Sequence, residues 1–425
     1  MRVCIFTLGS RGDVQPYLAL AQELIRCGHK AVLCTGGSFR TLIESHGVSF
    51  IGTSSDLMAL AKTAEGKTVM EHPVRNFHKA LALTKKVINP AYRKTLHEFL
   101  VTAQDADCIV YHPKALGAVD IALYYDIPCI SMPPIPTIYP IKEFANLACT
   151  TRNLGPWLNR MSYRINDMAE RPLIKLINDF RVHELSWKPR KPGIYTLHDE
   201  KRDIPIMYPI SSLLFPEVTS WNDRVSLPGF FYTAEKNSNL PDKLQKFLSS
   251  GPQPIAITFS SMPLKLPDRF LSNLEVALQQ SNNRAVLLTG NSGIDCDDTD
   301  RICVLPEMSH QTLFSHVKAV VHHGGVGTTA AALRAGIPQL IMPFSVDQPF
   351  WAKRMQLLGV GVNPLKEKNA TPDLLVRLML ELESPAIVEK AASTGKIIRE
   401  EDGVKNATHI IENMVEKWPL SQTRS

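Results

Sequence analysis

The stretch HHGGVGTT, residues 322–329, constrains the fold of this chain more than any other part of it. It follows the apolar run Ala319–His322, which has the length and composition of a buried strand. It leads into Thr328–Arg334, which has the pattern of a helix, with Gly336 and Pro338 as stop signals. A strand, a glycine-bearing turn and a helix in this order indicate a βαβ unit in a parallel sheet.

The same alternation occurs in both halves of the chain, and 425 residues are enough for two domains. We therefore expect an α/β fold with two Rossmann-like domains whose parallel sheets face a central cleft. Residues 139–191 are helical in pattern, and residues 205–232, rich in proline and aromatic residues, should be extended. Strands are expected at Arg2–Leu8, Lys30–Thr35, Val48–Ile51, Cys108–Tyr111, Pro128–Met132, Pro254–Phe259, Ala285–Thr289, Ala319–His322 and Gln339–Met342.

Composition excludes several classes of protein. The net charge of +6 comes from basic residues scattered among acids, which argues against a nucleic-acid-binding protein and favours an acidic ligand or an anionic membrane surface. The N-terminus lacks the apolar core of a signal peptide, and no window is apolar enough to span a bilayer. A cytoplasmic protein is expected, with peripheral membrane contact left open. The eight cysteines form no C-x-x-C pair and predict neither disulfides nor a zinc site.

The glycine turn is a candidate site for a phosphate group, because a helix N-terminus offers free N–H groups and a partial positive charge. The Walker sequence G-x-x-x-x-G-K-[ST] is missing, and the turn at Gly9–Asp13 does not match G-x-G-x-x-G, so ATP hydrolysis and NAD are disfavoured. The competing interpretation is a tight turn with two satisfied core histidines. The residues expected at a diphosphate are His323, Gly324, Gly325, Gly327, Thr328 and Thr329.

Several linked motifs carry a resemblance to a known family. HHGGVGTT, then AGIP, then PFSVDQPFWAKRMQLLGVGV resembles the donor-binding segment of the two-Rossmann-domain (GT-B) glycosyltransferases that use nucleotide sugars. GSRGDVQPYLALAQELIRCGHKAVLCT is similar to the N-terminus of sterol glucosyltransferases and vancomycin-type antibiotic glycosyltransferases, and more loosely to that of a rhamnolipid rhamnosyltransferase. With YHPKALGAVDIALYYDIPCISM and SLPGFF, the resemblance covers almost the whole chain.

The resemblance implies roles for particular residues. Residues 1–235 would bind the acceptor, residues 236–404 the nucleotide sugar, and residues 405–425 would form a helix that crosses back to the first domain. His323, Thr328 and Thr329 would hold the diphosphate, with Ser261 also at the donor. The family usually has glycine where this chain has Ser260, directly before Ser-Met. Asp347 and Gln348 would grip sugar hydroxyls, which suits a carboxylate and an amide, although Asp347 could instead cap a helix.

Asp13 is the candidate catalytic base, since transfer to an alcohol requires removal of the acceptor proton as the new bond forms. The resemblance to the antibiotic enzymes supports this role, with Ser10 orienting the acceptor or the sugar. The alternative is that Asp13 is the N-cap of the helix that follows.

The expected function is an inverting glycosyltransferase that moves a hexose, glucose from UDP-glucose first of all, to a sterol, another lipid or a polyketide. No cofactor, metal or obligate protein partner is expected, because Asp295, Asp297 and Asp298 have the pattern of solvated turn residues. The alternatives are a sugar-nucleotide epimerase on the same scaffold, a rhamnosyl or deoxysugar transferase, and a non-catalytic binding module.

Overall fold

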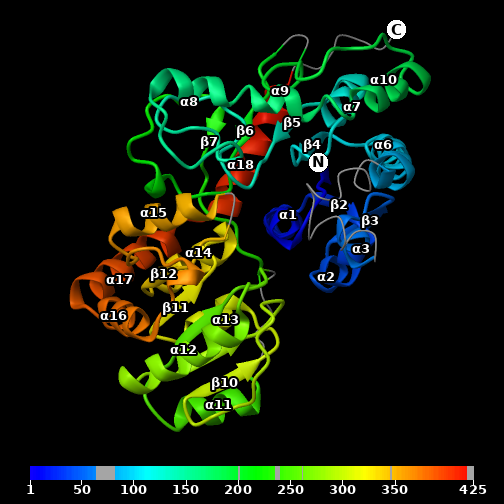
Figure 1. Ribbon diagram of the computed structural model, residues 1–425. Helices are drawn as coiled ribbons and strands as arrows, with labels where there is room; N and C mark the ends of the chain where they lie inside the picture. The colour runs from blue at the N-terminus through cyan, green and yellow to red at the C-terminus, as the bar shows by residue number, and fades with distance from the viewer. Residues whose placement is uncertain (64–81, 200–201, 235–239, 261, 345–346, 419–425) are drawn as a thin grey trace. The chain divides into compact units, whose positions relative to one another are not determined.

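The computed structural model describes residues 1–63, 82–199, 202–234, 240–260, 262–344 and 347–418 (Figure 1). The chain divides into two compact units. The first unit comprises residues 1–234 together with the chain from Asp402 onward. The second unit comprises residues 235–401. Each unit holds one parallel sheet covered by helices, which confirms the predicted α/β class.

The first unit holds a seven-stranded sheet in the order β3-β2-β1-β4-β5-β6-β7. Its strands are β1 (Arg2–Phe6), β2 (Lys30–Gly36), β3 (Ser49–Thr53), β4 (Cys108–Tyr111), β5 (Cys129–Ser131), β6 (Ile206–Met207) and β7 (Val225–Ser226). Its helices are α1 (Arg11–Arg26), α2 (Arg40–Ser45), α3 (Leu57–Lys62), α6 (Asn89–Thr102), α7 (Ala118–Tyr125), α8 (Pro156–Ser162), α9 (Ile165–Ala169), α10 (Ile174–His183) and α18 (Gly403–Glu416), with shorter turns η1 (Gly37–Phe39), η2 (Thr84–Ile88) and η3 (Ser212–Leu214).

The second unit holds a five-stranded sheet in the order β10-β9-β8-β11-β12. Its strands are β8 (Ile255–Thr258), β9 (Ala285–Leu288), β10 (Ile302–Leu305), β11 (Ala319–His322) and β12 (Gln339–Ile341). Its helices are α11 (Asp242–Ser249), α12 (Pro267–Gln280), α13 (His310–Phe314), α14 (Val326–Ala335), α15 (Gln348–Leu358), α16 (Pro372–Leu382) and α17 (Pro385–Glu400), with the short turn η4 (Glu367–Asn369).

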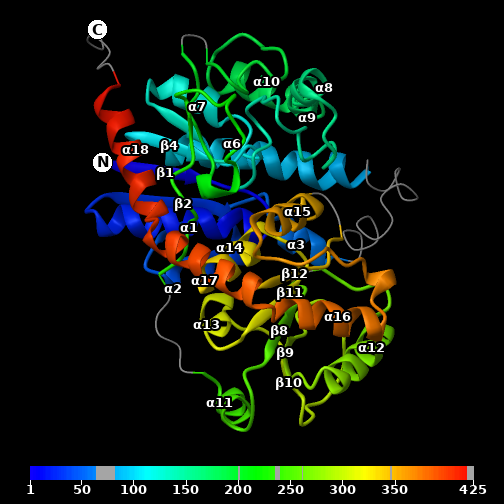
Figure 2. The ribbon, with the colours of Figure 1, turned by 90° about the vertical axis from the view of Figure 1, so that its left-hand side faces the viewer.

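The C-terminal helix α18 belongs to the core of the first unit. It lies beside α1 (Figure 2), and its fully buried Ala407 and Ile411 share a cluster with Leu18 and Leu24 of α1. At the surface of this contact, Nε2 of His29 lies 2.8 Å from a carboxylate oxygen of Glu412. Apolar burial therefore ties the end of the chain to its first helix.

Two details differ from the sequence prediction. The strand β10, with the residues ICVL, was not predicted, because four apolar residues between polar turns give a weak signal. The region predicted as helical, residues 139–191, contains α8, α9 and α10 only from Pro156 onward. Its first part is irregular, without a helix. The stretch 205–232, which was expected to be extended, contributes the two short strands β6 and β7 and the turn η3, and the rest of it is irregular.

Candidate functional site

The centre of the second sheet has the geometry of a ligand crevice. The strands β8 and β11 are neighbours, but β9 follows on the far side of β8 and β12 on the far side of β11. In open parallel sheets, ligands bind at the carboxyl ends of strands at such a switch point. The chain leaves β8 through Ser260 and leaves β11 through His323. The predicted donor residue Ser261 lies outside the described residues.

The turn after β11 approaches the sheet so closely that only glycine fits. Gly324 has φ +91°, and a Cβ added there would lie 2.6 Å from Cγ2 of Ile341. A Cβ on Gly325 would lie 2.5 Å from Nε2 of His323, so this glycine leaves room for the imidazole. Gly325 is also the N-cap of α14, and no side chain caps this helix. The N–H groups of the first turn are therefore left to a ligand or to water.

The two adjacent histidines have different environments. Nδ1 of the fully buried His322 accepts a hydrogen bond from the N–H of Gly324 at 3.1 Å, and its Nε2 lies 3.0 Å from Oε1 of Gln339. By contrast, Nδ1 of His323 is buried without a hydrogen-bond partner among the described residues. Burial lowers the pKa of His322 to about 3 and that of His323 to about 4. Both rings are neutral near pH 7. Of the two, only His323 has a ring nitrogen without a hydrogen-bond partner among the described residues.

The predicted threonines lie in the first turn of α14, but they differ in their contacts. Thr329 is fully buried, and its hydroxyl donates to the carbonyl oxygen of Gly325 at 3.0 Å. This hydroxyl is engaged within its own helix. Thr328 is almost completely buried, and Gly327 beside it is exposed, with open space where a Cβ would be.

Asp347 and Gln348 lie next to the glycine turn. A Cβ on Gly324 would lie 3.3 Å from both Cβ and the carbonyl oxygen of Gln348. Asp347 is the N-cap residue of α15, but its side chain makes no capping hydrogen bond, and Oδ2 accepts from Nε1 of Trp351 at 2.6 Å. Oε1 of Gln348 accepts from the N–H of Phe344 at 2.7 Å. The fold thus brings the predicted acid and amide to the predicted diphosphate turn.

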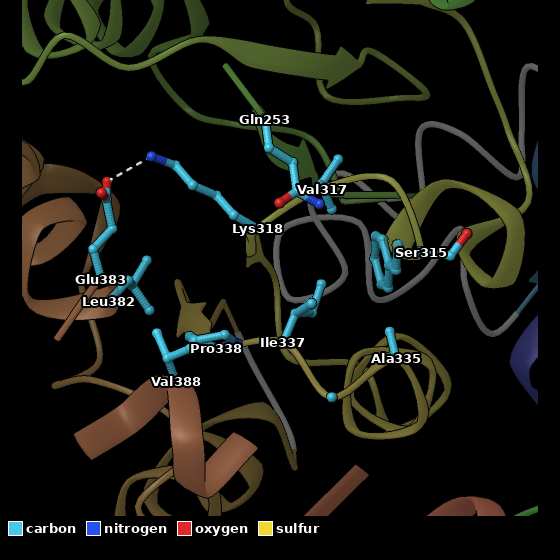
Figure 3. A pocket seen from close by; sticks show the side chains of 12 residues that line it. Gln253, Ser315, Val317, Lys318, Ala335, Ile337, Pro338, Leu382, Glu383 and Val388 are labelled. Carbon is cyan, nitrogen blue, oxygen red and sulfur yellow. Dashed lines mark ion pairs between the residues drawn. The ribbon is translucent and has the colours of Figure 1, made fainter. Parts of the chain in front are cut away.

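A hollow of about 460 Å³ lies at the opposite edge of this sheet (Figure 3). Its lining includes Gln253, Lys318 and Pro338, which precede β8, β11 and β12. The ammonium of Lys318 is paired with Glu383 at 2.9 Å. This amino-end hollow lies away from the turn after β11 and contains none of the predicted site residues.

The first sheet also has a switch point, between β1 and β4, and the polar residues after these strands meet there. Oδ1 of Asp13, from the turn after β1, lies 2.9 Å from Nζ of Lys114 and 3.1 Å from Nε2 of His112, both from the chain after β4. Oδ2 accepts from the N–H of Ser10 at 2.7 Å and from its hydroxyl at 2.9 Å. Both oxygens of this carboxylate therefore have close polar neighbours.

Asp13 is not the N-cap that the alternative interpretation proposed. Ser10 is the N-cap of α1, and Asp13 is the third helical residue of a capping box. Nδ1 of His112 accepts from the N–H of Lys114 at 2.9 Å, so in the neutral ring the proton is on Nε2, which faces Asp13. The contact of Nε2 with the carboxylate is close but not aligned as a hydrogen bond.

The electrostatics of this cluster follow from its contacts. Burial alone would raise the pKa of Asp13, but His112, the Lys114 ammonium and the N–H of Ser10 outweigh it and hold this pKa well below its usual range. Burial lowers the pKa of His112 against the opposing effect of Asp13. Near neutral pH the cluster holds an ionised carboxylate beside a neutral imidazole.

Sequence reasoning did not select His112 and Lys114. The signal was present, because HPK follows the fully buried strand β4 and its polar residues must lie at the carboxyl edge of the sheet. Which strands are neighbours, and hence that Lys114 meets Asp13, is a property of the fold. Within the described residues, no group of three or more His, Cys, Asp or Glu side chains could hold a metal ion. Over the same residues, no helix is long and apolar enough to cross a membrane.

Family models match both units. Residues 3–113 match the glycosyltransferase family 28 N-terminal domain, and residues 300–414 match the erythromycin biosynthesis protein CIII-like C-terminal domain. Among solved structures, the glycotransferase of kitacinnamycin aligns with a TM-score of 0.71 at 18% identity, over 97% of this chain and 98% of that one. The glycosyltransferase VinC aligns with a TM-score of 0.66 at 17% identity, over 98% and 100%. At identities this low, the structural similarity supports a common fold and nothing further.

Curated relatives match over nearly the whole chain. A sterol 3-beta-glucosyltransferase of Arabidopsis thaliana is 30% identical over 96% of this chain and 64% of its own length. A sterol 3-beta-glucosyltransferase of Pichia angusta is 31% identical over 98% of this chain, which spans only 34% of that protein. The O-mycaminosyltylonolide 6-deoxyallosyltransferase of Streptomyces fradiae is 26% identical over the full length of both chains.

Proposed function

Because this chain belongs to the two-Rossmann-domain (GT-B) glycosyltransferases, we propose that it transfers glucose from UDP-glucose to a hydroxyl group of a lipophilic acceptor, a sterol, another lipid or a polyketide. The observation that carries the proposal is the turn after β11. A neutral, buried imidazole lies there beside a helix N-terminus, and among the described residues neither its Nδ1 has a hydrogen-bond partner nor the helix a side-chain cap. Neutral donors and a helix dipole at one place suit a diphosphate.

The proposed reaction is a single displacement with inversion. The acceptor oxygen forms a bond to the anomeric carbon while the bond from that carbon to the diphosphate breaks, and the nucleoside diphosphate leaves. The proton of the acceptor hydroxyl passes to the carboxylate of Asp13. The negative charge that develops on the diphosphate is stabilised by the N–H groups at the start of α14 and by His323.

Each remaining site residue has a proposed task. Asp347 and Gln348 bind hydroxyls of the sugar, and Thr328 and Ser261 bind the donor. Thr329 supports the turn by its bond to Gly325, which is a structural task and differs from the predicted contact with phosphate. Ser10 orients the carboxylate of Asp13 through its N–H and hydroxyl. The enzyme is proposed to act in the cytoplasm, without a metal or a further cofactor.

The contacts of Asp13 add one requirement to this reaction. An acceptor hydroxyl can reach Oδ1 only after one of the groups already there has left. Lys114 is the group that can leave, because its side chain is 51% exposed, whereas that of His112 is 5% exposed. We therefore propose that Lys114 swings out when the acceptor binds, and that His112 holds the carboxylate in position.

The test is a panel of sugar nucleotides offered with a lipid extract, followed by mass spectrometry of the conjugates and measurement of nucleoside diphosphate release. UDP-glucose should yield a conjugate heavier than its acceptor by one hexose. Asp13→Asn should lose turnover and keep donor binding, because the amide preserves the shape of the turn. Folded protein that releases no nucleoside diphosphate from any donor would contradict the proposal.

A deoxysugar donor is the second candidate, favoured by the relative from Streptomyces fradiae, which this chain matches over the full length of both. The same panel separates the two if it includes thymidine-diphosphate deoxysugars with a polyketide acceptor. A changed sugar nucleotide formed without any acceptor would instead identify an epimerase.

A further inference from the structure

The helix α8 has an inverted pattern of burial. Its one buried side chain is an amide, Asn159. Its large apolar residues face solvent: Trp157 is 71% exposed, Leu158 49% and Met161 38%, and Leu154 just before the helix is 42% exposed. Met161 lies four positions after Trp157 and three after Leu158, so these three residues share one side of the helix. Leu154 lies directly before the N-cap, Gly155. Isolated exposed apolar residues are ordinary, but a contiguous group of this size marks an interaction surface.

Hydrogen bonds from the polar side of α8 fix this apolar face in place. Nδ2 of Asn159 donates to the carbonyl oxygen of Lys142 at 2.8 Å, and Oδ1 accepts from the N–H of Leu154 at 2.9 Å. The hydroxyl of Ser162, one turn on, accepts from the N–H of Asn146 at 2.8 Å. The polar side of α8 is thus pinned to the body of the unit. The apolar side chains are therefore exposed on a fixed support. Figures 1 and 2 show the place of α8 in the first unit.

The exposed charges in this part of the chain are basic. Four exposed arginines lie in or near α8 in the sequence, Arg152, Arg160, Arg164 and Arg171. None of these four side chains forms an ion pair with another described residue. The acidic residues of the same stretch are less exposed. Glu170 is buried, with its carboxylate 2.6 Å from the guanidinium of Arg190, and Asp167 is half-buried. Between residues 152 and 171, every fully exposed charge is positive.

We propose that this surface, formed by Leu154, Trp157, Leu158 and Met161 with the four arginines and called here the α8 surface, docks the protein on an anionic phospholipid bilayer. Tryptophan suits the interface between headgroups and acyl chains, leucine and methionine can enter the upper acyl region, and arginines meet the lipid phosphates. The purpose of the docking rests on the proposed function, since a lipophilic acceptor dissolves in a bilayer and docking brings the first unit to it.

The charge pattern favours a bilayer over a second copy of this chain. A symmetric dimer through this face would bring the arginines of one copy against those of the other. Such like-charge contacts oppose association. An anionic bilayer attracts the same arginines and accepts the apolar side chains without requiring a matching shape.

The experiment is co-sedimentation of the full chain with phosphatidylcholine vesicles, with and without phosphatidylserine, in the absence of any sugar nucleotide. Wild-type protein should bind the anionic vesicles and release them at high salt. Trp157→Ser and Leu158→Ser should each weaken binding roughly tenfold through lost apolar contact. Arg160→Gln should weaken it about fivefold, and only on vesicles with phosphatidylserine. Leu357→Ser, at a leucine that is 68% exposed on α15, and Arg269→Gln on α12 are the matched controls and should have no effect.

Because the assay needs no turnover, its outcome is independent of the proposed transfer reaction, and Asp13→Asn should bind vesicles like wild type. The proposal is overturned if wild-type protein does not bind anionic vesicles, or if the α8 variants bind as the controls do. It is also overturned if these variants abolish a dimer in analytical ultracentrifugation and leave vesicle binding unchanged. A higher KM for a soluble acceptor, again with unchanged vesicle binding, would reassign the surface to acceptor binding.

Discussion

At the scale of single residues, the proposed base, Asp13, is restrained by its own neighbours. Lys114 and His112 hold the pKa of Asp13 well below its usual range, against the opposing effect of burial. A carboxylate with so low a pKa is ionised at every physiological pH, but it is a weak proton acceptor. Lys114 supplies part of this effect on the pKa of Asp13, and its side chain is half-exposed. Movement of Lys114 away from Asp13, as proposed above, would therefore raise this pKa.

Lys114→Met should therefore raise the pKa of Asp13. Transfer needs the ionised carboxylate, so the acid limb of the kcat/KM profile should move to higher pH in the variant, from below the usual range of an aspartate toward about 4. Lys188→Met, at another exposed lysine of the first unit, is the control. An acid limb at the same pH in Lys114→Met and wild type would show that Lys114 does not act on the base.

Ser260 carries backbone strain just after the carboxyl end of β8. Its φ of +53° lies in the left-handed region, at the position where the sequence departs from the glycine of similar enzymes. Ser260→Gly should raise the free energy of unfolding by about 0.5–1 kcal/mol, since relief of about 1–2 kcal/mol exceeds the added chain entropy of glycine. The control is Ser384→Gly, at a serine with φ −61° whose side chain makes no capping hydrogen bond. This variant should lower the free energy of unfolding, and both variants are measured by urea denaturation. Equal effects in the two variants would argue against strain at Ser260.

At the scale of elements, the patterns with a clear period were predictable and those set by tertiary contacts were not. The residues Val14, Leu18 and Leu24 predicted one buried face of α1, and the structure buries all three. The helix α14 begins two residues earlier than predicted, at Val326, since glycine and valine gave no helical signal. The burial of Asn159 in α8 does not follow from a linear pattern, because it depends on the carbonyl group of Lys142, 17 positions away in the sequence.

The helix α18 provides the prediction at this scale. Ile411 is fully buried in the cluster that α18 shares with α1 and the first sheet. Ile411→Ala should lower the unfolding free energy of the first unit by about 2–4 kcal/mol through the loss of apolar contact and the cavity that it leaves. Ile397→Ala, at a residue 47% exposed on α17, is the control. A similar loss in both variants, measured by urea denaturation, would contradict the packing of α18 described here.

At the scale of the whole molecule, the sequence predicted two parallel sheets with a glycine turn at the centre of the second. It also predicted that His323, Gly324 and Gln348 would come together, and the structure brings them into contact around one turn. It could not predict that the hydroxyl of Thr329 bonds to Gly325 at the start of its own helix, or that Lys114 contacts Asp13. Both depend on side-chain directions and strand order, which a linear pattern does not contain.

The most direct test of the account is a crystal structure of the protein with UDP. The account predicts density for the diphosphate at the N-terminus of α14, with a ring nitrogen of His323 within hydrogen-bonding distance of a phosphate oxygen. It also predicts that His323→Ala weakens UDP binding in calorimetry by roughly tenfold or more. Density at the amino-end hollow between Lys318 and Glu383, or unchanged affinity in His323→Ala, would contradict it.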